Sequence, residues 1–183
     1  RGVGCAVTTW PYNAGAGAAL ARCTLFPDGG VEIANACQDL GTGSRTVMAV
    51  TAAETLVLGL EAIKITMGDT QLGLAGPESS GSVTTSNIAP AVRSAAYKAQ
   101  QQVFALAAQK WGIAVENVAC QNGMVYAMDN PAVTMPWNEA AALMGLDPII
   151  TTARDPAKPS VRGVSLGTQM RGAQFAEVEV DTT

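Results

Sequence analysis

The stretch Gln38-Asp-Leu-Gly-Thr-Gly-Ser-Arg-Thr-Val47 places a glycine-rich loop directly before a predicted helix. That helix is expected over about Thr46–Val57, with Gly59 as its C-terminal cap. Glycine permits positive φ and lets a ligand approach the backbone, while a helix start offers unpaired N–H groups and partial positive charge. The sequence therefore predicts that Gly41 and Gly43 open an oxyanion-binding loop.

A second loop of the same kind follows later in the chain. Gly81-Ser-Val-Thr-Thr-Ser86 ends the Gly-, Ser- and Thr-rich segment Gly68–Ser86 and leads into a helix predicted over about Ala89–Lys110. Apolar residues recur there every three or four positions, Pro90 suits a first turn, and Gly112 suits the end. Neither loop has the dinucleotide fingerprint or a P-loop. From these residues alone, structural turns with Ser and Thr caps remain an open alternative to a binding site.

The elements around these loops alternate between strands and helices. Phe26-Pro-Asp-Gly-Gly30 is a hairpin turn signal, because Asp-Gly accepts positive φ at low cost. The predicted fold is a two-layer α+β domain over residues 1–183, with a mixed sheet, helices packed on one face and strand hairpins. The remaining predicted elements are strands over Val3–Trp10, Ala18–Leu25, Val31–Ala36, Ile63–Met67, Val115–Ala119, Met124–Ala127, Ile149–Thr152 and Phe175–Asp181, a helix over Pro136–Leu146 and a loop over Asp155–Val164.

The composition indicates a folded chain that normally contacts other protein. Of the 183 residues 48% are hydrophobic and 14% are charged, and the net charge is −4. A typical domain has about 25% charged residues, so part of this surface is expected to be covered. Basic residues are scattered singly, which argues against nucleic acid and anionic membranes, and no apolar run reaches the roughly 20 residues of a bilayer span. Both ends look cut, so the chain is expected to be a piece of a longer one.

Histidine is absent, and the cysteines lack the spacing of a metal site. Without histidine, Ser-His-Asp and Cys-His nucleophile systems are excluded. No pair of cysteines forms C-x-x-C, so zinc and iron–sulfur sites are not expected, and free buried thiols are predicted instead. The four cysteines are Cys5, Cys23, Cys37 and Cys120.

Two charged residues beside the loops have open interpretations. Asp69 follows a predicted strand and is expected to form a turn through side-chain to backbone bonds, with a functional role as the alternative. Arg45 stands at the start of the first predicted helix, where a cation opposes the helix dipole. A neighbouring carboxylate, an anionic ligand or simple solvation would each account for this arginine.

Short motifs follow one another along nearly the whole chain. They are Asp28-Gly-Gly-Val31, Gln38–Val47, Ala52-Ala-Glu54, Gly68-Asp-Thr70, Gly81–Thr85 with Ala91-Val92, and Gly172–Asp181. In order and spacing they resemble the xanthine dehydrogenase and aldehyde oxidase family of molybdenum hydroxylases, in the molybdopterin-binding part of the large subunit. Each motif is modest alone, and the ordered set carries the resemblance.

The resemblance implies a site for a molybdenum-molybdopterin cofactor, with the cytosine dinucleotide form as one option. Thr42 stands where the family commonly has glutamine, so backbone contacts are implied in place of a long amide contact. Gly81 would lie nearest the molybdenum, through its backbone only. Both helix starts are expected to open on one shared pocket. The implied cofactor-binding residues are Leu40, Gly41, Thr42, Gly43, Gly81, Ser82, Val83 and Thr84.

The same resemblance implies an oxidoreductase that hydroxylates an aldehyde or an N-heterocycle with oxygen from water. The family's base, a glutamate in a Gly-Gly-x-Gly-Glu segment, has no counterpart here, so no catalytic residue is assigned and the isolated chain is expected to be inactive. Expected partners are the remainder of the large subunit and separate iron–sulfur and FAD modules, in the cytoplasm or, for an exported complex, the periplasm. A stand-alone phosphate- or nucleotide-binding domain and a non-catalytic assembly domain remain alternatives.

Overall fold

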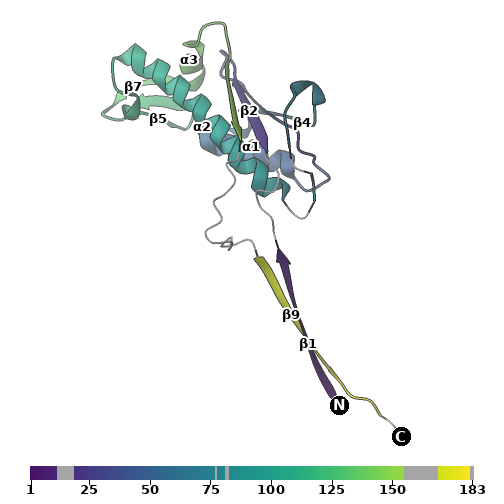
Figure 1. Cartoon of the computed structure of the whole chain (residues 1–183). Coiled ribbons are helices and arrows are strands. Elements are labelled where there is room, and N and C mark those ends of the chain that lie inside the picture. Colours follow the sequence, from purple (N-terminus) through teal and green to yellow (C-terminus); the bar gives the residue numbers. More distant parts are fainter. Residues whose placement is uncertain (12–18, 77, 81–82, 155–168, 182–183) are drawn as a thin grey trace.

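The computed structural model describes residues 1–11, 19–76, 78–80, 83–154 and 169–181. It consists of a body built on a four-stranded sheet and a two-stranded ribbon that extends away from that body (Figure 1). The predicted α+β class, with a mixed sheet and helices on one face, is confirmed. No helix in the described ranges is both long and apolar enough to cross a membrane.

The sheet has the strand order β4-β3-β2-β8. β2 (Leu20–Leu25) and β3 (Val31–Asn35) form an antiparallel hairpin, and β8 (Ile149–Arg154) pairs antiparallel with β2. β4 (Ile63–Met67) runs parallel to β3, because a helical crossover connects them. The predicted turn of the hairpin is confirmed. Its residue Gly29 has φ +90°, where a side chain would be strained.

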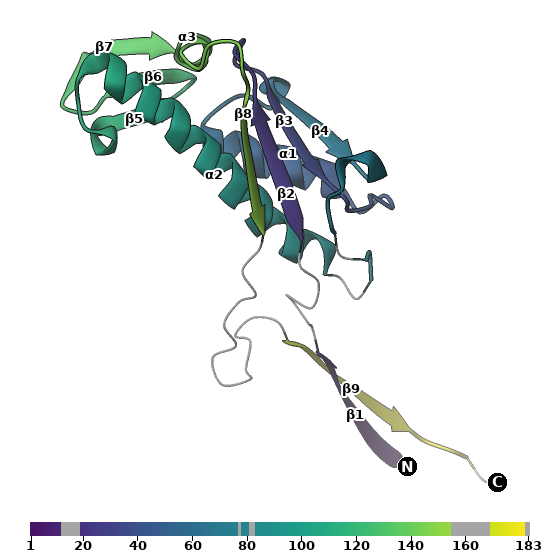
Figure 2. The ribbon, with the colours of Figure 1, turned by 45° about the horizontal axis from the view of Figure 1, so that its top comes forward.

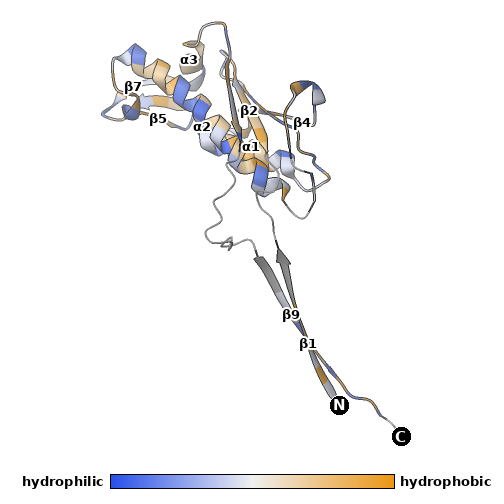
Figure 3. Ribbon diagram, in the orientation of Figure 1, coloured by the Kyte–Doolittle hydropathy of each residue, from blue (hydrophilic) through white to orange (hydrophobic). Residues whose placement is uncertain are grey.

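Two helices cover one face of this sheet, as Figure 2 shows. α1 spans Ser44–Leu56 and α2 spans Thr84–Trp111. Many buried residues of α2 are alanines, which let the helix lie close to the strands, and Thr151 Oγ1 of β8 donates to the backbone oxygen of Ala95 at 2.7 Å. Apolar residues gather where helices and strands meet (Figure 3). The core includes Leu25, Ile33, Met48, Leu56, Ile88, Val92 and Val103.

Both long helices differ from prediction at one end. α2 begins at Thr84, five residues earlier than expected, so Pro90 lies inside the helix and not in its first turn. α1 ends in a left-handed residue, as expected, but that residue is Val57 (φ +60°) and not Gly59, whose backbone is extended (φ −69°). The Gly59 cap is therefore wrong, whereas the predicted cap Gly112 is confirmed with φ +69°.

A second, three-stranded sheet lies beside the C-terminal part of α2. β5 (Val118–Gln121) and β6 (Met124–Ala127) form the predicted hairpin, with Asn122 and Gly123 both at positive φ in its turn. β7 (Asn130–Pro136) pairs with β6 and was not predicted from the sequence. The helix after it, α3 (Trp137–Ala142), is shorter than expected, and Trp137 Nε1 donates to the backbone oxygen of Gly29 at 3.0 Å.

The ribbon is formed by the first and last strands of the chain. β1 (Gly2–Pro11) and β9 (Gln169–Val178) pair antiparallel, with Cys5 opposite Phe175. The last strand was predicted over Phe175–Asp181, so it begins and ends earlier than expected. The loop predicted over Asp155–Val164 lies outside the described residues.

Candidate functional site

The loop before α1 and the start of α2 share one cavity of about 320 Å³. Leu40 and Thr42 of the first loop and Thr84 of the second lie in its wall, so the structure brings these three predicted residues together. Gly41, Gly43 and Val83 neighbour lining residues in sequence but are not among them. The lining residues are Leu40, Thr42, Ser44, Ser79, Ser80, Thr84 and Thr85.

Every lining residue except Leu40 carries a hydroxyl group. Thr42 Oγ1 and Ser44 Oγ lie 3.1 Å apart, and Thr84 Oγ1 donates to Ser79 Oγ at 3.3 Å. A hydroxyl is neutral and can both donate and accept, so this wall can bind a ligand through either role. The cavity is thus suited to a polar ligand that carries many oxygen and nitrogen atoms.

The long loop between β4 and α2 is attached to the loop before α1. Ser79 Oγ donates to Gln38 Oε1 at 3.0 Å. Gly76 lies directly against the end of β3, where a Cβ would meet the carbonyl carbon of Ala36 at 2.8 Å and the nitrogen of Cys37 at 3.0 Å. This close approach requires glycine, and it holds the hydroxyl-bearing part of the loop beside the first glycine-rich loop.

The N-terminal amides of α1 are already bound by a carboxylate of the chain itself. Asp39 Oδ1 accepts from the N–H of Gly41 at 3.0 Å and of Gly43 at 3.1 Å, and Oδ2 accepts from the N–H of Arg45 at 3.0 Å. Hydrogen bonds from the backbone lower the pKa of Asp39 below its ordinary value, because they stabilise the charged carboxylate. The largest effect comes from the N–H of Arg45, followed by those of Gly43, Gly41 and Thr42. The expectation that Gly41 and Gly43 present free amides to an oxyanion is therefore wrong, because the anion at this helix start is Asp39.

Arg45, the cation at the start of α1, contacts Asp39 through its backbone only. The backbone of Arg45 donates to Asp39, and its guanidinium extends to β4, where Nη1 donates to the backbone oxygen of Ile65 at 2.8 Å. The guanidinium therefore turns away from Asp39, and because Arg45 is exposed, its interpretation as a solvated arginine stays open. The turn interpretation of Asp69 is confirmed, since Oδ1 of Asp69 accepts from the N–H of Gln71 at 2.9 Å.

The start of α2 differs from that of α1. Its N-cap, Val83, makes no side-chain capping bond, and the first helical residue, Thr84, faces the cavity. Gly81 and Ser82 lie outside the described residues, so the position of Gly81 beside molybdenum stays a prediction. Within the described part of the chain, no group of three or more His, Cys, Asp or Glu residues could hold a metal ion.

The four cysteines differ in their burial. Cys23 and Cys37 are buried free thiols, as predicted, and burial raises the pKa of Cys23 to about 12 and that of Cys37 to about 11. Burial also raises the pKa of Cys120, which is partly exposed, to about 11. Cys5 is exposed, so the expectation of a buried thiol is wrong at that position.

The sequence interpretation missed Ser44, Ser79, Ser80 and Thr85, which complete the cavity. Ser44 directly follows Gly43 and could have been included with the first loop. Ser79 and Ser80 lie in a segment interpreted only as a connection, and no periodic pattern there indicates which hydroxyl groups would face the first loop.

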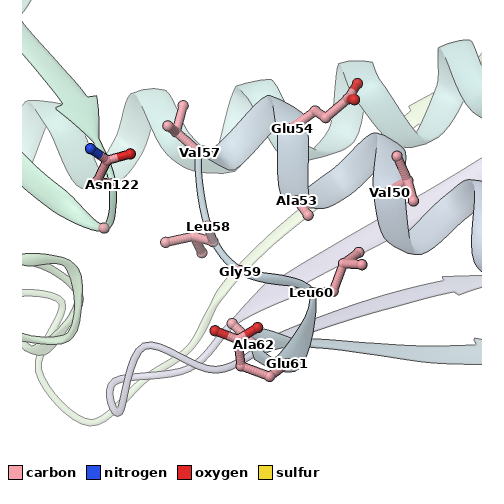
Figure 4. A pocket seen from close by; sticks show the side chains of 11 residues that line it. Val50, Ala53, Glu54, Val57, Leu58, Gly59, Leu60, Glu61, Ala62 and Asn122 are labelled. Carbon is pink, nitrogen blue, oxygen red and sulfur yellow. The ribbon is translucent and has the colours of Figure 1, made fainter.

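A larger and more open cavity of about 820 Å³ lies elsewhere, between the end of α1 and the turn of the β5–β6 hairpin. Figure 4 shows Val57, Leu58 and Leu60 along the connection that leaves α1, with Asn122 across from them. None of the residues predicted to bind a cofactor lines this cavity.

Comparison with solved structures identifies the same fold in three larger chains. Quinoline 2-oxidoreductase from Pseudomonas putida 86 matches with a TM-score of 0.75 and 21% identity, over 95% of this chain and 24% of that chain. Reconstituted CO dehydrogenase from Oligotropha carboxidovorans matches with a TM-score of 0.75 and 20% identity, over 95% and 23%. The Cu,Mo-CO dehydrogenase in its carbon monoxide reduced state matches with a TM-score of 0.73 and 19% identity, over 95% of this chain and 23% of that chain. The chain thus spans about a quarter of the length of these structures.

Family comparison gives a match over the full length. Residues 1–183 match the family described as the molybdopterin cofactor-binding domain. No curated protein matches the sequence. Because the match covers the whole chain, the predicted molybdopterin-binding resemblance is confirmed, and the chain belongs to the molybdopterin cofactor-binding domain family.

Proposed function

We propose that this chain forms one wall of the molybdopterin site of a larger oxidoreductase and that it binds and orients the cofactor. The observation that carries this proposal is the shared cavity, where Thr42 of one loop and Thr84 of the other lie in a wall of hydroxyl groups. Family membership supports the choice of ligand. When bound, the molybdenum cofactor would supply the redox chemistry, and the protein would supply binding, orientation and electrostatics.

The residues present fit part of this cofactor. Hydroxyl groups can donate to phosphate and pterin oxygens and can accept from pterin N–H groups. The cavity of about 320 Å³ is at the lower end of the roughly 300–1,000 Å³ of small-molecule sites, which suits one wall of a site better than a complete enclosure. We infer that the remaining walls come from the rest of the large subunit.

The carboxylate at the start of α1 gives the proposed site an orientation. Asp39 places a negative charge on the side of the first loop, where it would repel a phosphate. At the start of α2, Val83 makes no side-chain capping bond, and the partial positive charge of a helix start favours an anion. We therefore propose that the phosphate lies toward Thr84 and Thr85 and the pterin ring toward Thr42.

The wider assignment follows the family resemblance. We propose that the parent enzyme hydroxylates an aldehyde or an N-heterocycle with oxygen from water, and that its base, the cytosine form of the pterin, the iron–sulfur clusters and FAD are contributed from outside these residues or by other subunits. We propose a cytoplasmic location for this enzyme. The rival stand-alone phosphate-binding domain is disfavoured, because Asp39 already binds the amides of α1.

The test is cofactor retention in the full-length protein that contains this chain. Thr84→Val and Thr42→Val each remove one hydroxyl group with little change in size, and each is expected to lower the molybdenum and pterin content by about tenfold, because each removes a supporting contact to the cofactor. The matched control is Thr152→Val, at an exposed position on β8 outside the cavity. Unchanged molybdenum content in both variants would contradict the proposal.

A further inference from the structure

One face of the β1–β9 ribbon is apolar and exposed. Directly opposite residues of an antiparallel pair project to the same side of the ribbon. The side that carries Glu177, opposite Val3 near the tip, also carries five apolar residues, which are Val3, Cys5, Val7, Ala173 and Phe175. We call these five residues the apolar ribbon face. Val3 is 76% exposed, Val7 74% and Phe175 75%.

Such a ribbon requires a partner. Two strands without further packing are marginally stable in water, and contiguous exposed apolar residues mark interaction surfaces. The opposite side carries Gly2, Gly4 and Ala6 of β1 with Gln174, Ala176 and Val178 of β9, so Val178 is its one large apolar residue among the positions whose side chains the structure describes. Glu177 lies on the same side as the apolar ribbon face, opposite Val3, and its carboxylate forms an ion pair with Arg1, so its charge is neutralised there. The face therefore suits an apolar partner and not a charged one.

The three solved structures indicate which partner this is. They superpose on 95% of this chain, and the unmatched residues are fewer than the ten of either ribbon strand. Some of the ribbon is thus present in chains about four times as long, where three quarters of the polypeptide remain to cover it. A covalently attached partner acts at high effective concentration, which a second copy of the chain does not.

We propose that the apolar ribbon face docks against an apolar surface of the remaining polypeptide of the same large subunit. This inference rests on the proposed function only in assuming such a subunit, and it requires no cofactor. The ribbon then acts as an arm that fixes the cofactor-binding body to the parts of the enzyme that complete the site.

Cys5 is a native probe for this contact. In the folded full-length protein, alkylation with N-ethylmaleimide followed by peptide mass spectrometry should label Cys5 at least about tenfold more slowly than after denaturation, because a covered thiol is inaccessible. Buried Cys23 should stay unlabelled and serves as the marker of a folded body. Rapid labelling of Cys5 with Cys23 still protected would overturn the proposal. Protection of Cys5 that disappears on dilution would also overturn it, because a second copy would then be the cover.

A pair of variants on β9 separates docking from other effects. Phe175→Lys places a charge on the apolar ribbon face and is expected to make Cys5 reactive, whereas Val178→Lys, on the opposite face of the same strand, should leave Cys5 protected. Equal labelling of Cys5 in both variants would contradict the assigned face. Molybdenum content is measured in parallel. If Cys5 is protected but Thr84→Val leaves cofactor retention unchanged, the proposed function alone is refuted. If Cys5 is labelled rapidly but Thr84→Val lowers cofactor retention, the docking alone is refuted.

Discussion

At the scale of single residues, Asp39 decides the character of the first loop. In the sequence, Asp39 stands just before a Gly-x-Gly segment and a helix. Because glycines and helix starts favour oxyanions, this pattern can also be interpreted as a binding site for an external anion. The structure shows that the left-handed glycines Gly41 and Gly43 turn their amides onto Asp39 instead. An internal carboxylate therefore stabilises the start of α1 and leaves ligand binding to the neighbouring hydroxyl groups.

The stabilising effect of Asp39 is expected to depend on pH. Its pKa is lowered in the folded chain, so it stabilises the fold at pH values above the unfolded value of about 3.9, and this stabilisation is lost as the pH falls through the lower folded pKa. Asp39→Asn should therefore lower the urea midpoint at pH 7, and the difference from the unmodified chain should shrink below about pH 4. Asp147→Asn, at an exposed position that caps no helix, is the control. A deficit of Asp39→Asn that is the same at pH 7 and pH 3 would show that the charge has no role.

At the scale of elements, the end of α1 contains a local strain that a single substitution should relieve. Val57 is β-branched and has φ +60°, a conformation that costs about 1–2 kcal/mol for residues with a Cβ. Val57→Gly removes that cost and loses the contacts of a side chain that is 38% exposed, so we expect a gain of about 0.5–1 kcal/mol in the free energy of unfolding. Urea denaturation measures the change.

The control for Val57→Gly is Val50→Gly, inside the same helix. It should destabilise the chain by about 0.5–1 kcal/mol, because glycine costs conformational entropy at a helical position. Destabilisation by both substitutions would mean that the packing of Val57 outweighs its backbone strain.

Sequence patterns predicted those elements whose signals are local. The turn at Gly29 and the cap at Gly112 were predictable, because glycine stands where positive φ is needed. Val57 was not, since nothing in a β-branched residue indicates a left-handed conformation. Pro90 misplaced the start of α2, because proline is most common in first turns, whereas here neighbouring packing keeps the helix continuous through it. β7 was missed because prolines near its ends weaken the strand signal.

The candidate site was predictable to a similar extent. Motif order led to Thr42 and Thr84, which do line one cavity. Which anion binds the N–H groups at the start of α1 depends on how one side chain folds back over three backbone groups. A sequence pattern that favours any anion cannot distinguish Asp39 from a ligand. Ser79 and Ser80 line the cavity in a segment held by contacts between distant parts of the chain, since Gly76 lies against the end of β3 and Ser79 donates to Gln38.

At the scale of the whole molecule, the chain presents surfaces that it does not cover itself. The hydroxyl wall is one side of a cavity of about 320 Å³, and the ribbon exposes apolar side chains on a projecting pair of strands. A ligand held by one wall keeps much of its surface in water, whereas tight small-molecule sites bury about 70–90% of it. Cofactor binding is therefore expected to require the complete subunit.

The 183-residue chain is expected to bind little cofactor when it is produced alone. When the hydroxyl groups of one wall bind the cofactor, they exchange hydrogen bonds to water for hydrogen bonds to the cofactor, and the net gain in free energy is only about 0.5–1.5 kcal/mol for each bond. This gain does not offset the translational and rotational freedom that the cofactor loses on binding. The isolated chain should therefore retain less than about a tenth of the molybdenum per protein found in the full-length enzyme, and it should show no aldehyde-dependent dye reduction. Metal analysis and a dye assay on the two proteins, at equal concentration, make the comparison. Turnover by the isolated chain would mean that these residues contain a complete active site, and it would contradict the proposal that the base is contributed from outside them.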